Sequence, residues 1–128
     1  MPQQTDLAII LRTQDMGEAD RLITCLAAQE GRLRLVAKNA RKSQRRFANC
    51  LEPLSLVKIS YTLKPQQDLG RLELGELVAD FRNLRQHLPA LAAALALAEV
   101  AGELVGAIDQ VGAIFHLLRQ ALTALSSG

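Results

Sequence analysis

The amino-acid composition of this 128-residue chain changes near residue 80, and that change limits the fold more than any other feature. Before it, short apolar runs alternate with polar residues and are separated by turn residues, which is typical of β-strands. From about Phe81 the chain is rich in Leu and Ala, which favours helices. The sequence therefore predicts a β-structured domain over residues 1–80 and an α-helical segment over residues 81–128.

Five runs in the first part are candidate strands, at residues 7–12, 22–27, 32–38, 57–64 and 72–78. The run at 32–38 alternates most regularly, with Leu33, Leu35 and Ala37 on one face and Arg32, Arg34, Val36 and Lys38 on the other. The run at 22–27 is ambiguous, because its apolar residues also have helical spacing. Gly75 is the expected bulge of the last run. Five short strands with turns at 29–31 and 66–70 indicate a small antiparallel barrel or sandwich.

The second part carries two apolar patterns with helical spacing. One stripe comprises Leu84, Leu88, Leu91, Ala92 and Leu95. A longer seam comprises Leu104, Ile108, Val111, Phe115, Leu118, Leu122 and Leu125. We expect a helix break between Ile108 and Gly112, with Asp109 as a cap, although the continuous seam argues for one helix. The seam either packs onto the preceding helix and the barrel or is covered by a second copy or another protein.

Basic residues are concentrated in one stretch, although the formal net charge is only +2. Seven of them, and no acidic residue, lie in residues 31–51. Such a band attracts phosphates, and arginine adds bidentate hydrogen bonds. The competing interpretation is a solvated charged edge that blocks strand aggregation. The seven residues are Arg32, Arg34, Lys38, Arg41, Lys42, Arg45 and Arg46.

Aromatic residues make up only 3% of the chain, and the first part contains two of them, Phe47 and Tyr61. Single-strand binders that tolerate any sequence stack bases on several aromatic rings. Tyr61 falls on the expected core face, and Phe47 either stacks a base or anchors its loop in the core. The sequence therefore predicts nucleic-acid binding through phosphates, with a steep dependence on salt.

No pattern in the sequence indicates catalysis, a cofactor or a metal site. His87 and His116 are isolated, and two cysteines 25 residues apart form neither a zinc motif nor a disulfide framework. Cys25 is expected in the core and Cys50 at the surface beside a loop. The N-terminus lacks the features of a secretory signal, and the longest uncharged run is too short for a membrane span. We expect a cytoplasmic protein that is not an enzyme.

Several strings, taken in order, resemble the N-terminal half of the bacterial DNA repair protein family RecO. The resemblance continues more loosely to residues 115–122. The strings that carry it are residues 8–13, 17–22, 30–38, 40–41, 46–47 and 51–53.

This resemblance implies an OB-fold followed by part of a helical domain, with residues 22–27 as a strand. It implies a mediator of repair and recombination that binds single- and double-stranded DNA, anneals complementary strands, and loads RecA with RecR and single-strand-binding protein. Arg21 either contacts DNA or forms an ion pair with Glu18 or Asp20. The DNA contacts that the resemblance implies fall on Arg12, Arg21, Arg32, Arg34, Lys38, Arg41 and Arg46.

The chain departs from the family pattern in three ways. Asn39 stands where the family has glycine, and we expect the turn to survive because Asn tolerates positive φ. The connection between the helical segments is shorter than usual. Family members are also considerably longer, and the cysteine-rich metal site that some of them carry lies beyond residue 128, so no metal is expected here. The alternative function is a protein-interaction adaptor that uses the apolar helical seam, including self-association.

Overall fold

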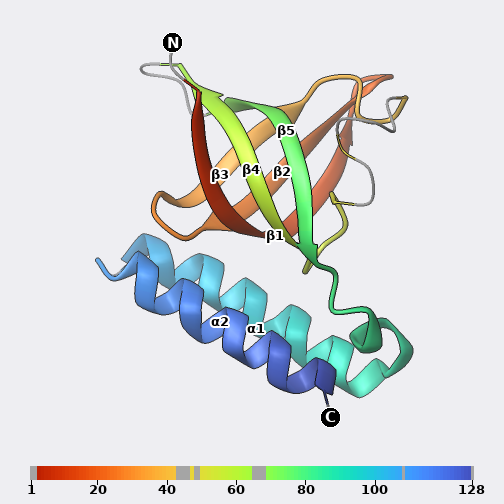
Figure 1. Ribbon diagram of the computed structural model, residues 1–128, viewed down its shortest axis with the longest axis vertical. Coiled ribbons are helices and arrows are strands. Elements are labelled where there is room, and N and C mark those ends of the chain that lie inside the picture. The colour runs from red at the N-terminus through yellow and green to blue at the C-terminus, as the bar shows by residue number, and fades with distance from the viewer. Residues whose placement is uncertain (1–2, 43–46, 48–49, 65–68, 108, 128) are drawn as a thin grey trace.

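The computed structural model describes residues 3–42, 47, 50–64, 69–107 and 109–127. Five strands close into a barrel in the order β1-β2-β3-β5-β4, and helices follow (Figure 1). All neighbouring pairs are antiparallel except β3 and β5. This arrangement is the OB-fold, which confirms the predicted fold class. The elements are β1 Gln4–Met16, β2 Asp20–Ala27, β3 Gly31–Ala37, β4 Leu56–Leu63, β5 Gly70–Ala79, the 3₁₀ helix η1 Arg82–Gln86, α1 Leu88–Ala107 and α2 Val111–Ser127.

The barrel interior is built from the inward residues of alternating strands. In β3 the buried and exposed residues alternate as the sequence predicts, with the arginines outside. Tyr61 is buried in this core and donates a hydrogen bond from its hydroxyl to Oε1 of Gln4 at 3.2 Å. Phe47 is also buried in this core, so the interpretation of Phe47 as an anchor is the correct one.

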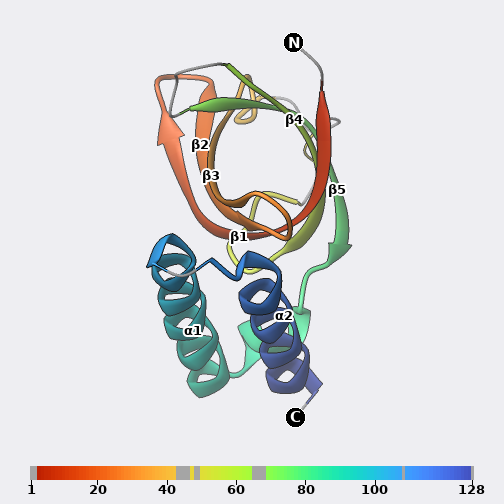
Figure 2. The ribbon, with the colours of Figure 1, turned by 90° about the vertical axis from the view of Figure 1, so that its left-hand side faces the viewer.

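A second core lies between the outside of the barrel and the helices, which cover the wall formed by β1 (Figure 2). In β1, Ala8 and Ile10 face the interior while Ile9 faces the helices, and all three are fully buried. Leu26 of β2 joins Ile9 in this second core. A strand buried on both faces loses its alternation of apolar and polar residues. That burial explains why residues 22–27 have an ambiguous pattern and are nevertheless a strand.

Helix α1 buries its small residues, so the predicted stripe is wrong at Leu88 and Leu95, whereas Leu84 and Leu91 do pack in the second core. Leu88 is 75% exposed and Leu95 is 43% exposed, whereas the buried face consists of Ala94, Ala98, Ala101, Gly102 and Val105. A Cβ at Gly102 would lie 2.9 Å from Cδ1 of Leu11. Helix α1 approaches β1 so closely that large side chains do not fit between them.

The helical part breaks where the sequence predicts, because α1 ends at Ala107 and α2 begins at Val111. The α2 portion of the predicted seam packs on α1 and the barrel through Phe115, Leu118 and Leu122. Leu104, at the start of the seam, is exposed instead, and Ile108 lies outside the described residues.

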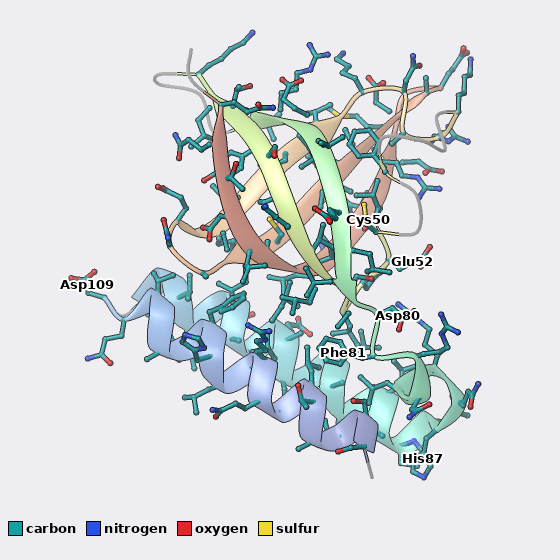
Figure 3. The ribbon with its side chains drawn as sticks, viewed as in Figure 1. Cys50, Glu52, Asp80, Phe81, His87 and Asp109 are labelled. Atoms are coloured by element: carbon teal, nitrogen blue, oxygen red, sulfur yellow. The ribbon has the colours of Figure 1, made fainter. Side chains whose placement is uncertain are left out.

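A short link connects the barrel to the helices through Asp80 and Phe81 (Figure 3). Phe81 has a φ of 47° at the start of η1. The guanidinium of Arg85 donates hydrogen bonds to the carbonyl of Pro53 at 3.0 Å and to that of Asp80 at 3.3 Å. Asn83 donates from Nδ2 to the carbonyl of Ser126 at 3.0 Å. These bonds fasten η1 to the barrel and to the end of α2.

Gly75 is not the bulge of β5, because it pairs with Ile59, and the register shifts fall at Glu73 and Val78 on either side of it. A Cβ at Gly75 would instead lie 2.7 Å from Sγ of Cys50. Glycine therefore makes room for the cysteine, which lies against β5 (Figure 3). The expected surface position of Cys50 is wrong, since its side chain is fully buried.

By length and composition α1 meets the criterion for a membrane-spanning helix. A core helix of a soluble protein meets the same criterion. One side of α1 packs against α2 and the barrel. The sequence of α1 also includes two charged residues, Glu99 and Glu103.

Candidate nucleic-acid interface

The outer face of the sheet formed by β1, β2 and β3 carries cationic side chains from β1 and β3. Residues that pair across neighbouring strands point to the same face. Arg12 pairs with Thr24, which pairs with Arg34, so these three form one row across the sheet. Arg32 lies one row nearer the helices, and Lys38 follows the other end of β3. Six residue steps along a strand separate Arg32 from Lys38, about 20 Å.

Beyond this face lies a cleft of about 540 Å³ between the β1–β2 turn and the ends of β4 and β5. In Figure 2 this turn lies beside the ends of those strands, on the side of the barrel away from the helices. The loops between strands 1 and 2 and between strands 4 and 5 are the ones that bind nucleic acids in OB-folds. The lining residues are Met16, Gly17, Asp20, Val36, Lys38, Thr62, Lys64, Leu69, Gly70, Arg71 and Glu73.

Among the described residues, three cations line this cleft, and only Lys38 of them belongs to the basic band of residues 31–51. Lys64 and Arg71 belong to the ends of β4 and β5, and they reach Lys38 because the barrel closes by parallel pairing of β3 with β5. The signal for them is present in the sequence, since they flank the turn between the last two strands. Arg71 lies 3.5 Å from Oε1 of Glu73, a partly exposed ion pair that contributes little to stability and can be exchanged for a phosphate.

Asp20 fixes the loop that follows β3. Its Oδ1 accepts a hydrogen bond from the backbone N–H of Asn39 at 2.8 Å, and its Oδ2 lies 3.3 Å from Nζ of Lys38. The Asn39 bond, with further contributions from Lys38 and Arg71, holds the pKa of Asp20 below its ordinary value. Asn39 has a φ of 61°, so the turn survives with Asn in place of glycine, as expected.

Arg41 joins the same loop to the β1–β2 turn. Its guanidinium donates hydrogen bonds to the carbonyls of Gly17 at 3.0 Å and Glu18 at 3.2 Å. Its Nε lies 3.7 Å from Oδ1 of Asp15, and its backbone N–H donates to the carbonyl of Ala19 at 3.0 Å. Arg41 therefore holds the β1–β2 turn against the loop that follows β3.

The remaining predicted site residues have several different surroundings. Arg21 lies 3.6 Å from Asp15, so its ion-pair partner is not Glu18 or Asp20. Lys42 is exposed. Arg45 and Arg46 lie outside the described residues.

Arg12 and Arg32 line a separate groove against α1, together with Glu99 and Glu103. The structure therefore does not bring all of the predicted cations together in one band.

Both cysteines are buried as free thiols. Burial raises the pKa of Cys25 to about 12 and that of Cys50 to about 11, so neither is a thiolate nucleophile at neutral pH. His87 and His116 lie exposed on the helical part. No group of three or more metal-ligating side chains occurs among the described residues.

Comparisons with known proteins agree with this geometry. A family model described as "Recombination protein O N terminal" matches residues 1–81. The chain is 40% identical over 118 residues to the DNA repair protein RecO of Syntrophobacter fumaroxidans, covering 92% of this chain and 46% of that protein. It is 35% identical over 127 residues to the RecO of Myxococcus xanthus, covering 99% of this chain and 52% of that protein.

A third relative, the RecO of Koribacter versatilis, is 37% identical over 121 residues, covering 94% of this chain and 50% of that protein. The chain thus spans about half the length of the curated relatives that it matches. Because the family model covers the barrel and the relatives extend through both helices, the chain belongs to the RecO family.

Proposed function

We propose that this chain is the DNA-binding part of a non-catalytic DNA repair protein that acts in the cytoplasm at the nucleoid. Residues 1–80 form its DNA-binding domain and residues 81–128 part of a helical domain. The observation that carries the proposal is the gathering of Lys38, Lys64 and Arg71 at the cleft where OB-folds bind nucleic acids. Lys64 and Arg71 lie outside the basic band of residues 31–51, and barrel closure brings them to Lys38.

A strand bound in this cleft would continue along the outer face of β3 past Arg34. The cleft also contains Asp20 and Glu73, so its excess of positive charge is modest and phosphates must displace exposed ion pairs. Binding of this kind reads the sugar–phosphate backbone and carries little sequence preference. The residues proposed to contact phosphates are Arg34, Lys38, Lys42, Lys64 and Arg71, together with Arg45 and Arg46 of the loop.

Annealing follows from the same surface. Cations along the track lower the repulsion between two phosphate backbones, so that a second strand can approach the first and pair with it. The buried aromatic side chains leave the bases of the bound strand free of stacking platforms on the protein. Membership of the RecO family supports joint action with RecR and single-strand-binding protein in RecA loading.

Fluorescence anisotropy with labelled single- and double-stranded oligonucleotides tests the binding. Counted over the five described residues of this set, one phosphate contact each on a single strand predicts a log–log salt slope of about −3.5. The double variant Lys64→Ala/Arg71→Ala should reduce the slope to about −2, because two contacts are lost. Lys58→Ala/Arg119→Ala removes the same charge from surfaces outside the cleft and should leave the slope unchanged. A wild-type slope near zero would overturn the electrostatic mode of binding.

The second candidate function is a protein-interaction adaptor. An apolar groove of about 280 Å³ lies between α1 and α2, lined by Leu97, Val100, Ala101, Leu104, Ile114, Leu117, Leu118 and Ala121. The discriminating variant is Leu104→Glu/Leu117→Glu. The adaptor function is correct if three results are obtained together. Leu104→Glu/Leu117→Glu abolishes binding of RecR or single-strand-binding protein, and Lys64→Ala/Arg71→Ala leaves that binding intact. The wild-type chain binds no DNA.

A further inference from the structure

The barrel and helix α1 enclose a groove of about 260 Å³ that carries charges of both signs. Arg12 and Arg32 come from the outer face of the barrel, and Glu99 and Glu103 come from α1. All four side chains are exposed. None of the ion pairs among the described residues joins the two sides, so the charges act on one another across the groove.

The close approach of α1 to the barrel creates this juxtaposition. Gly102 lies between the two glutamates and faces Leu11 of β1, where a Cβ would be only 2.9 Å from Cδ1. Glu99 and Glu103 are the only charged residues of α1. Two glutamates four residues apart repel each other on a helix, and the facing arginines offset that repulsion.

The position of the groove along the sheet gives it a role in DNA binding. The cationic rows run from the cleft at Lys38 and Arg71, past Arg34, to Arg32 beside the helices. At the helix end the two arginines face two carboxylates across the groove, and the carboxylates repel a phosphate that the arginines attract. A DNA backbone that follows the rows thus meets a surface without net positive charge at Arg32.

We propose that Glu99 and Glu103 set the helix-side boundary of the DNA-binding surface by neutralising Arg12 and Arg32. This inference rests on the proposed function of the barrel and adds a limit to it. Arg12 and Arg32 form a phosphate subsite that α1 keeps closed. The bound strand is confined to the rows between Arg34 and the cleft.

The test compares Glu99→Gln/Glu103→Gln with wild type by anisotropy with single-stranded DNA over a salt series. Glutamine keeps the shape of the side chain and suits a helix. The variant should bind about five- to tenfold more tightly at low salt, and its slope should steepen from about −3.5 to about −5, since two more phosphates are neutralised. Arg12→Ala/Arg32→Ala should change wild-type binding less than about twofold, and in the glutamine background it should restore the original slope.

Glu76→Gln/Asp109→Asn is the matched control, because both residues are exposed and lie outside the groove. It changes the net charge by the same amount and should leave the slope unaltered. The proposal is overturned if Glu99→Gln/Glu103→Gln and Glu76→Gln/Asp109→Asn strengthen binding equally. It is also overturned if Arg12→Ala/Arg32→Ala flattens the salt slope in the otherwise wild-type chain. If wild type binds no DNA, both the proposed function and the proposed boundary are wrong. If wild type binds DNA but Glu99→Gln/Glu103→Gln changes neither the affinity nor the salt slope, only the proposed boundary is wrong.

Discussion

The Asp20 carboxylate accepts a 2.8 Å hydrogen bond from the backbone N–H of Asn39. The bond ties the start of β2 to the loop after β3, at the edge of the cleft that contains Lys38, Lys64 and Arg71. A carboxylate held in this way is stabilised in its charged form. Asp20 in its charged form therefore helps to hold the loop after β3 at the edge of the cleft.

The first prediction concerns the pH dependence of folding. The pKa of Asp20 is lowered in the folded state from its ordinary value of 3.8. Its contribution to stability is therefore fully present above pH 3.8 and is lost as the pH falls through the folded-state pKa. Asp20→Asn should lower the free energy of unfolding at pH 7, and the difference from wild type should shrink towards pH 3. Urea denaturation at several pH values measures this, and a difference independent of pH would contradict it.

The second prediction concerns the backbone at Asn39, whose φ is 61°. Asn39→Gly should leave the free energy of unfolding within about 0.5 kcal/mol of wild type, because glycine adopts positive φ without steric cost. Asn39→Val should lower it by about 1–2 kcal/mol, since a left-handed conformation strains a β-branched residue. Urea denaturation compares the two variants, and equal stabilities would show that the loop relaxes to another conformation.

The third prediction separates positioning from phosphate contact at Arg41. Its guanidinium is bound to the carbonyls of Gly17 and Glu18, so Arg41→Ala should weaken DNA binding by releasing the β1–β2 turn while leaving the salt slope unchanged. Lys64→Ala should instead flatten the slope by about 0.7. Anisotropy over a salt series distinguishes the two. A flattened slope in Arg41→Ala would make Arg41 a phosphate ligand.

The fourth prediction concerns barrel closure at Gly70. A Cβ there would lie 2.7 Å from the backbone carbonyl of Thr62 and 2.8 Å from Cδ2 of Leu35. Gly70→Ala should lower the free energy of unfolding by about 1–3 kcal/mol, because a backbone atom cannot easily move aside. Gly106→Ala in α1, where nothing lies within 4 Å, should raise it by about 0.5–1 kcal/mol. Chemical denaturation of both variants measures the contrast, and destabilisation by both would contradict this account.

The alternating pattern of β3 predicts its structure well because one face meets the core and the other meets solvent. The same reasoning was ambiguous for β2, where Leu26 packs under the helices while Ile23 and Cys25 face the interior. In α1 it was wrong for Leu88 and Leu95, because a leucine stripe normally marks the buried face, whereas here close packing against Leu11 selects Gly102 and alanines.

The candidate site was predicted only in part because its members are distant in the sequence. Lys38 and Arg71 meet through the pairing of β3 with β5, which no local pattern encodes. The neutralisation of Arg32 by Glu99 is equally non-local, since 66 residues separate them along the chain. A count of charges within residues 31–51 therefore includes arginines that face carboxylates and omits cations that line the cleft.

The parallel contact that closes the barrel consists of two register pairs, Leu35 with Gly70 and Val36 with Arg71. Because the β3–β5 pairing is so short, we expect the barrel to open most easily there. Amide hydrogen exchange should be faster in this pairing than in the long β1–β2 ladder. Lys38 lies on the β3 side of this pairing and Arg71 lies on the β5 side. A nucleic acid that binds both cations binds only the closed form, so each bound strand stabilises the barrel by mass action. Under the proposed function, DNA affinity and the stability of the closed barrel are thermodynamically coupled, since a bound strand would bridge the shortest pairing in the sheet.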